Sequence, residues 1–193
     1  MRRKEQAEAS RAALIEAAAQ CFTEQGYEAT TVAGILERVG MARGALYHYF
    51  PGGKRELFAA VFDSINEAFH ERRDAVAGIP SPMGRIRAAA EVFLELCTEA
   101  EFARILLIEG PKHVPGQDQR GSTYALLRAQ LDEARSLGEL PDVDTEITAT
   151  ALYGAIRAAG DSIVAASDRA VARRDAARVI GHLLDGLTAE PAG

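Results

Sequence analysis

The side chains best suited to bind nucleic acid lie in one short stretch, residues 42–54. Arg43 carries a guanidinium group, which can donate two hydrogen bonds to the O6 and N7 acceptors of one guanine. Lys54 follows Pro51-Gly52-Gly53, which breaks the chain and starts a helix. Free amides at a helix N-terminus, with a cation beside them, attract a phosphate oxygen. The stretch could therefore both read a base and hold the DNA backbone.

A short helix is predicted just before this stretch. Its apolar residues recur at helical spacing on one face, namely Val32, Ile35, Leu36 and Val39. Thr30 or Thr31 can cap its first free amides, and Gly40 can adopt the left-handed conformation that ends a helix. A tight turn after Gly40 is therefore expected.

A second short helix then spans Ala42–Tyr49, with Leu46 and Tyr49 directed inward. Its outer side or edges carry Arg43, Gly44, Tyr47 and His48. This is the layout of a helix-turn-helix, whose second helix enters the major groove and brings its N-terminal residues to base edges. Small residues at Ala42 and Gly44 would let that helix lie close to DNA.

Two further helices are expected around this motif. Ser10–Gln25 carries one apolar stripe and stops at Gly26, and a long helix runs from Lys54 to about Val76. A nucleotide-binding loop before Lys54 is excluded because its glycine spacing is missing and no strand precedes it. A plain helix start that holds no ligand remains an alternative.

Four segments carry a family resemblance, and they lie within the run from about Ala9 to Phe69. They are Gly26-Tyr27, Thr30-Thr31-Val32, Leu46-Tyr47-His48-Tyr49-Phe50 and Lys54-Arg55-Glu56-Leu57. Joined to the preceding helix, they resemble the DNA-binding domain of the TetR/AcrR family of transcriptional regulators. The half from Pro82 to Gly186 looks like a divergent ligand-binding part of the same family.

The resemblance implies which residues touch DNA. Arg43 is expected to read a base, and Thr30 or Thr31, Tyr47, His48 and Lys54 to contact mainly sugar and phosphate. The DNA-binding set is Thr30, Thr31, Ala42, Arg43, Gly44, Tyr47, His48 and Lys54. Such a protein binds double-stranded DNA at a palindromic operator as a homodimer.

Composition predicts an all-α protein with two domains. The 193 residues are 48% hydrophobic, and no run of alternating β-branched residues suggests a sheet. The expected architecture is an N-terminal three-helix helix-turn-helix domain joined by a long helix to a C-terminal helical domain, with about nine helices in all. Breakers at residues 78–82 place the boundary so that residues 1–76 bind DNA, with the motif at about 31–50, and residues 77–193 bind a ligand and dimerise.

The net charge of −6 limits DNA binding to a local surface. Residues 1–60 contain eight Lys and Arg against seven Asp and Glu, so the rest of the chain holds the acidic excess.

The last two predicted helices carry broad apolar stripes rich in small residues, which suits a four-helix interface between two copies. The residues expected there are Ile156, Ile163, Val179, Ile180, Leu183, Leu184 and Leu187. The resemblance implies the same pairing across a two-fold axis. Burial of these stripes inside one chain is the alternative.

Polar residues that interrupt the apolar segments of the C-terminal half are candidates for binding an effector. They are Glu109, His113, Tyr124, Tyr153, Arg157 and Asp161. Each of them could instead be a paired or exposed structural group. Arg157 and Asp161, four residues apart on one helix, could simply pair with each other.

These observations favour a ligand-responsive regulator, a repressor by resemblance, that a small-molecule effector releases from DNA. The alternative is a constitutive DNA-binding regulator whose C-terminal domain only dimerises. No paired nucleophile and base, metal-ligand spacing or dinucleotide loop is recognisable, so we expect no enzyme, no metal site and no cofactor. Cys21 and Cys97 are expected to be buried free thiols, and no apolar run is long enough to span a membrane, which predicts a cytoplasmic protein.

Overall fold

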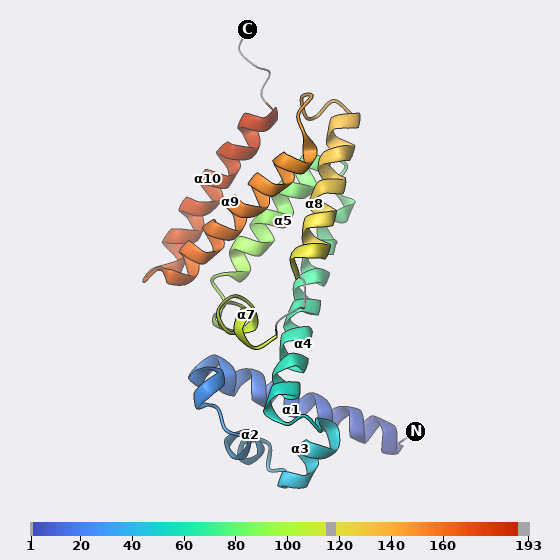
Figure 1. Cartoon of the computed structure of the whole chain (residues 1–193), viewed down its shortest axis with the longest axis vertical. Coiled ribbons are helices and arrows are strands. Elements are labelled where there is room, and N and C mark those ends of the chain that lie inside the picture. Colours follow the sequence, from blue (N-terminus) through green and yellow to red (C-terminus); the bar gives the residue numbers. More distant parts are fainter. Residues whose placement is uncertain (1, 115–118, 189–193) are drawn as a thin grey trace. The chain divides into compact units, whose positions relative to one another are not determined.

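The computed structural model describes residues 2–114 and 119–188, and the side chains of residues 4–114 and 121–188. Every regular element in these ranges is helical (Figure 1). If α6, η2 and α7, which follow one another over residues 100–113, count as one helix and the four-residue 3-10 helix over residues 75–78 is not counted, the described residues form nine helices. The predicted all-α class is confirmed. None of the described helices combines the length and hydropathy needed to cross a bilayer.

The chain divides into two compact units, and the division differs from the expected one. The first unit comprises residues 1–68 and 100–116, and the second comprises residues 69–99 and 117–193. The break therefore falls inside α4 (Lys54–Asp74) and not after residue 76. Residues 100–114 join the first unit because Phe102, Ile105 and Leu106, which are 0–3% exposed, supply part of its core.

The first unit is built on α1 (Arg2–Ala29). Leu14, Ala18 and Phe22 form its buried stripe and are fully inaccessible to solvent. The helix begins at Arg2, well before the expected Ser10, and its backbone leaves helical geometry at Gly26, where φ is 79° and ψ is 170°. The predicted stop at Gly26 is thus a sharp kink, and residues 27–29 form a short continuation.

Two short helices, α2 (Val32–Val39) and α3 (Arg43–Tyr49), pack in the same unit as α1 (Figure 1). Ile35 and Leu46 are 0% exposed, so each helix contributes a fully buried anchor. The first half of α4 adds Phe58, whose ring meets that of Phe22 edge to face at 5.0 Å. The remaining elements of the unit are α6 (Ala100–Phe102), the π-helical segment η2 (Ala103–Glu109) and α7 (Gly110–His113).

The second unit is a bundle of longer helices. It consists of the end of α4, η1 (Ala75–Gly78), α5 (Pro82–Leu96), α8 (Gln119–Ser136), α9 (Thr145–Ala165) and α10 (Arg169–Thr188). In Figure 1, α9 and α10 lie side by side in orange and red, with α5 in green next to them. Helices α9 and α5 come very close at Gly160, because a side chain there would collide with Phe93 and Cys97.

Three of the residues expected at a dimer interface belong instead to the core of this bundle. Ile163, Ile180 and Leu184 are 0–3% exposed within a single chain. Helices α9 and α10 each bury one face against α5 and against each other, and these three residues lie on that face. Val179 and Leu183 are 57% and 45% exposed, whereas Ile156 and Leu187 are half-buried. Part of each apolar stripe therefore packs inside the bundle, and only the remaining part is exposed to solvent.

Both cysteines are buried free thiols, as predicted. Burial raises the pKa of Cys21, and it raises the pKa of Cys97 to about 12. The thiolate is the reactive form, so neither side chain should react readily at neutral pH.

We expect the native protein at pH 8 to react with an aromatic disulfide reagent at least roughly tenfold more slowly than the protein unfolded in guanidinium, in which both thiols are exposed. Release of the coloured thiolate, followed over time, measures both rates. Fast reaction of one equivalent in the native protein would contradict the burial of that thiol.

Candidate nucleic-acid interface

The turn between α2 and α3 has helix-turn-helix geometry. Thr31 caps α2, since its Oγ1 accepts a hydrogen bond from the amide three residues later at 3.1 Å. Gly40 ends α2 with φ at 64°, and the amide of Met41 donates to the carbonyl of Leu36 at 3.0 Å. Glycine adopts this left-handed conformation at little cost, as predicted for this position. Helix α3 can therefore restart at Arg43.

Helix α3 has one buried side and one exposed side. Leu46 is 0% exposed, and Phe50, which follows the helix, is 1% exposed. The exposed residues follow the spacing i, i+1, i+4, i+5 and so lie on one face. They are Arg43, Gly44, Tyr47 and His48. We call these four residues the outer face of α3.

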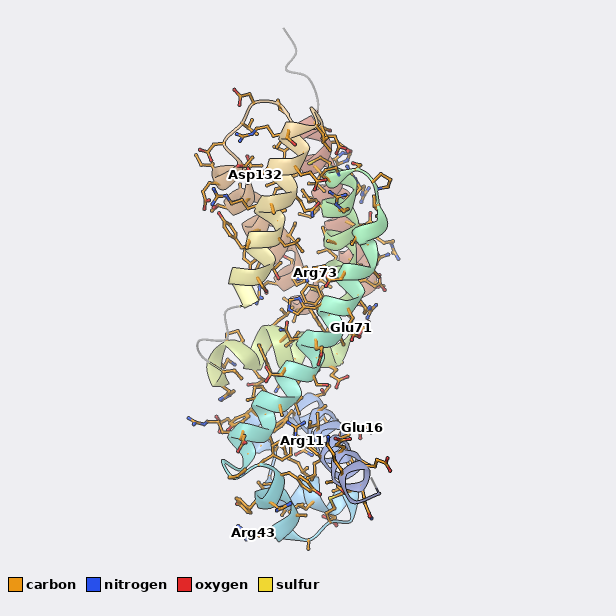
Figure 2. The ribbon with its side chains drawn as sticks, turned by 90° about the vertical axis from the view of Figure 1, so that its right-hand side faces the viewer. Arg11, Glu16, Arg43, Glu71, Arg73 and Asp132 are labelled. Atoms are coloured by element: carbon orange, nitrogen blue, oxygen red, sulfur yellow. The ribbon has the colours of Figure 1, made fainter. Side chains whose placement is uncertain are left out.

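Arg43 is the first residue of α3 and its side chain is free. Figure 2 shows it at the edge of the first unit, directed away from the neighbouring helices. It makes no hydrogen bond or ion pair with any other residue that the structure describes. All five N–H donors of its guanidinium thus remain available to a ligand.

The outer face also contains a glycine that the fold does not require. A Cβ added at Gly44 would meet no atom within 4 Å, and the residue has no positive φ. Glycine inside a helix costs about 1 kcal/mol relative to alanine, a large fraction for a helix of seven residues. No described residue requires a glycine at this position, so the helix is open here to close approach by an external surface.

Thr30 is not available to DNA, contrary to the expectation. Its side chain is 2% exposed, and its hydroxyl lies 2.7 Å from the carbonyl oxygen of Gly26 and 3.1 Å from that of Cys21. The hydroxyl donates to backbone oxygens of its own unit, so it is engaged inside the protein. Of the two threonines, only Thr31 is exposed.

The Lys54 side chain was also expected to be free to bind phosphate, and in the structure it is not free. Its ammonium donates to the carbonyl oxygens of Tyr27 at 3.0 Å and Thr30 at 3.1 Å, and the oxygen of Glu28 lies 3.5 Å away. The same ammonium lies 4.4 Å from the centre of the Tyr27 ring. The charge of Lys54 is therefore engaged by the end of α1.

The backbone amides at the start of α4, which were expected to bind phosphate, already interact with a carboxylate of the protein. The carboxylate of Glu56 accepts a hydrogen bond from the amide of Gly52 at 2.6 Å. A carboxylate in the first turn of a helix interacts favourably with the helix dipole, as a bound phosphate would. The helix supplies this anion itself, so the plain helix start, the alternative weighed for this segment, describes it better.

Sequence reasoning missed the ion pair that fixes α2 on α1. The guanidinium of Arg38 donates to both carboxylate oxygens of Glu24, at 3.0 and 2.8 Å, and to Gln20 at 3.2 Å. This hydrogen bonding lowers the pKa of Glu24. Glu24 is exposed, so the pair contributes to orientation more than to stability. Residues that lie 14 positions apart on two helices offer no periodic signal in the sequence.

Two of the expected effector residues, Glu109 and His113, lie in the first unit. Glu109 is 7% exposed, and its carboxylate lies 3.2 Å from the guanidinium of Arg104 and 3.4 Å from the imidazole of His113. The ring of His113 stacks on that of Tyr27 with centroids 3.8 Å apart. These groups have intramolecular partners, which favours the structural role for both.

The other four expected effector residues lie in the second unit and form two pairs. The hydroxyl of Tyr124 lies 2.6 Å from a carboxylate oxygen of Glu146, and its ring meets that of Tyr153 edge to face at 6.2 Å. Arg157 and Asp161 form an ion pair at 3.2 Å, which is the alternative that their spacing suggested. These contacts place polar groups next to one another, but they do not identify a ligand.

Comparison with known proteins agrees with this geometry. Residues 14–61 match the model of "Bacterial regulatory proteins, tetR family", and residues 83–187 match that of "Tetracyclin repressor-like, C-terminal domain". The second match alone covers more than half of the chain. The chain belongs to the TetR family. Members of this family are DNA-binding transcriptional regulators, and the matches point to such a regulator and not to an enzyme.

Individual relatives are similar over different lengths. The transcriptional regulator TtgR of Pseudomonas putida is 39% identical over 111 residues, which cover 54% of this chain and 50% of TtgR. The transcriptional repressor AcnR of Corynebacterium efficiens is 46% identical over 52 residues, 27% of each chain. The match thus spans half or less of these TetR-family relatives.

Similarity of the fold extends further. A crystal structure of a TetR-family transcriptional regulator from Pectobacterium atrosepticum has a TM-score of 0.80 at 26% identity. The alignment covers 97% of this chain and 98% of that one. Both units therefore have the TetR-family fold.

Replacing Gly44 with alanine should separate folding from DNA binding. The added methyl group meets open space, so the free energy of unfolding should rise by about 0.5–1 kcal/mol. If DNA approaches this face closely, affinity for a bound duplex should fall about tenfold, or about 1.4 kcal/mol. Thermal unfolding and a duplex titration measure the two effects.

Gly78→Ala is the matched control, because position 78 also has open space and lies outside the outer face of α3. It should leave DNA affinity unchanged. Equal affinities for Gly44→Ala and the wild type would show that no close approach occurs at position 44.

Proposed function

We propose that this protein is a ligand-responsive repressor that binds palindromic operator DNA as a homodimer in the cytoplasm. The observation that carries the proposal is the outer face of α3, where Arg43 has an exposed guanidinium without a partner among the described residues. An exposed cation at the N-terminal end of the second helix of a helix-turn-helix is placed to meet base edges in the major groove.

The residues of the interface divide by chemistry. Arg43 would read guanine through two hydrogen bonds, whereas Tyr47, His48 and Thr31 would donate to phosphate or sugar oxygens and carry little sequence information. Ala42 and Gly44 would allow the backbone of α3 to approach the groove. Thr30 and Lys54 are left out of this set because they are engaged within the protein.

The exposed surface of α9 and α10 supports a homodimer. Ile147 on α9 and Val171, Val179 and Leu183 on α10 are large apolar side chains that are 41–69% exposed. Burial of this surface against a second copy would form a four-helix interface.

Two glycines in the same helices have no steric explanation among the residues that the structure describes. A Cβ at Gly154 on α9 or at Gly186 on α10 would meet no atom within 4 Å. By contrast, the buried Gly160 is required because Phe93 and Cys97 occupy the space beside it. Glycine in a helix lets another helix approach closely, so the open pair fits a surface that a partner copy covers.

Repression by covering promoter DNA is favoured by the TetR-family match and by the relative AcnR, whose name describes a repressor. An effector would have to bind preferentially to the arrangement that does not fit the operator, because equal affinity for both states shifts nothing. Tyr124, Tyr153, Arg157 and Asp161 are the residues that we propose for it. A screen of metabolites for raised thermal stability and weakened operator binding tests the effector directly.

Arg43→Ala should relax base preference at one position in each half-site. The loss on the matched duplex should be about 1–3 kcal/mol per contact, with a much smaller loss on a duplex mismatched at that position. His48→Ala, a neighbour on the same face, should weaken both duplexes alike. Titrations of both variants on both duplexes test the assignment, and equal losses for Arg43→Ala on the two would refute it.

Gly154→Leu should weaken the dimer without harming the fold. The side chain enters open space, and leucine favours a helix by about 0.8 kcal/mol over glycine. In the dimer the same side chain would separate α9 from its partner and raise the dissociation constant at least roughly tenfold. Ala125→Leu, on an exposed position of α8, is the control. Sedimentation across a concentration series measures the dimer, and an unchanged constant for Gly154→Leu would exclude α9 from the interface.

A further inference from the structure

Lys54 lies between two elements that flank the helix-turn-helix. It is the first residue of α4, five positions after Tyr49 ends α3. Its ammonium reaches back to the end of α1, where it meets the carbonyl oxygens of Tyr27, Glu28 and Thr30. We call these three oxygens the carbonyl site.

The carbonyl site satisfies the ammonium. Two of the oxygens lie within normal hydrogen-bond distance, at 3.0 and 3.1 Å, and the third is 3.5 Å away. An ammonium has three donors, so little hydrogen-bonding capacity remains for a phosphate oxygen. The carbonyl oxygens at the end of a helix carry the negative end of its dipole, which further favours the cation where it lies.

The site is also held firmly from the other side. The Tyr27 ring lies 4.4 Å below the ammonium, stacks on Phe22 at 5.7 Å and meets Phe58 edge to face at 5.1 Å. These three aromatic residues come from α1 and α4. Lys54 therefore ties the last residues of α1 to the first residue of α4.

We propose that Lys54 is a positioning residue that sets the angle of α3 and does not contact phosphate. The chain between the carbonyl site and Lys54 contains α2 and α3, so this contact closes the loop that carries the outer face of α3. The inference rests on the proposed DNA-binding function. It predicts that loss of the contact weakens DNA binding by misplacing Arg43 and its neighbours.

Lys54→Met and Lys54→Arg test the proposal through the salt dependence of binding. Each phosphate contact contributes about 0.9 to the slope of log affinity against log salt concentration. Arginine binds phosphate at least as well as lysine, but its planar guanidinium cannot replace a compact ammonium among three converging oxygens. Both variants should therefore bind the operator at least roughly tenfold more weakly, with slopes within about 0.3 of the wild-type slope.

Arg55→Met is the control for net charge, because it removes an exposed positive charge from the next residue. Thermal unfolding of each variant reports whether it is folded. Wild-type affinity in Lys54→Arg, or a slope lowered by about one in Lys54→Met but not in Arg55→Met, would overturn the proposal.

Reductive methylation of the wild-type protein tests the same point without a variant. The chain has three lysines, Lys4, Lys54 and Lys112. Lys4 and Lys112 are exposed and serve as internal references. Mass spectrometry should show Lys54 reacting at least roughly tenfold more slowly than both in the free protein, with no further protection when DNA is added. Rapid reaction of Lys54 that DNA then blocks would indicate a phosphate contact.

The two proposals fail differently. If the wild-type protein binds no duplex at any salt concentration, the proposed function fails. The methylation rate of Lys54 in the free protein still supports or overturns its engagement with the carbonyl site.

Discussion

The burial of Leu46 and Phe50 is the constraint on which the DNA-binding account depends. Helix α3 has only seven residues, and an isolated helix of that length does not persist in water. Its stability must come from packing, and these two residues are 0% and 1% exposed. Because their positions are fixed, Arg43, Gly44 and Tyr47 have to lie on the opposite side. The chemistry of the interface is therefore a consequence of which residues the core holds.

Local rules predicted much of this unit. The spacing of Val32, Ile35 and Leu36 predicted α2, and the conformational freedom of glycine predicted the left-handed end at Gly40. The exposure of the outer face of α3 followed from the burial of Leu46. These features depend on neighbours within about one turn, so a single sequence contains the information. The TetR-family resemblance rested on the same residues.

Other features depended on contacts that the sequence does not display. A threonine that bonds backbone oxygens and one that caps a helix look alike in sequence, yet Thr30 is buried and Thr31 is exposed. Lys54 carries the charge that phosphate requires, but carbonyl oxygens in the residues after Gly26 accept its hydrogen bonds. The stripe that contains Ile163 is apolar whether it faces its own chain or a partner. Periodicity gives the direction of a side chain and not the identity of what it meets.

The helical glycines of this protein fall into two groups, those that the packing of the chain requires and those that it does not. Gly110 and Gly160 have neighbouring side chains where a Cβ would lie, so the folded chain itself excludes other residues there. Gly44, Gly154 and Gly186 have open space and cost helical stability. They lie on two exposed surfaces, the outer face of α3 and the exposed side of α9 and α10. A regulator that reads a two-fold site needs both surfaces, one for DNA and one for a second copy.

Selection of binding sites from random duplexes tests the central claim most directly. Wild-type protein should enrich an inverted repeat whose two half-sites contain a guanine contact and lie about one helical turn, 10–10.5 base pairs, or a multiple of it apart. The two-fold symmetry of the repeat would report the dimer, and the conserved guanine would report Arg43. Enrichment of a single asymmetric site, or of no sequence at all, would contradict the account.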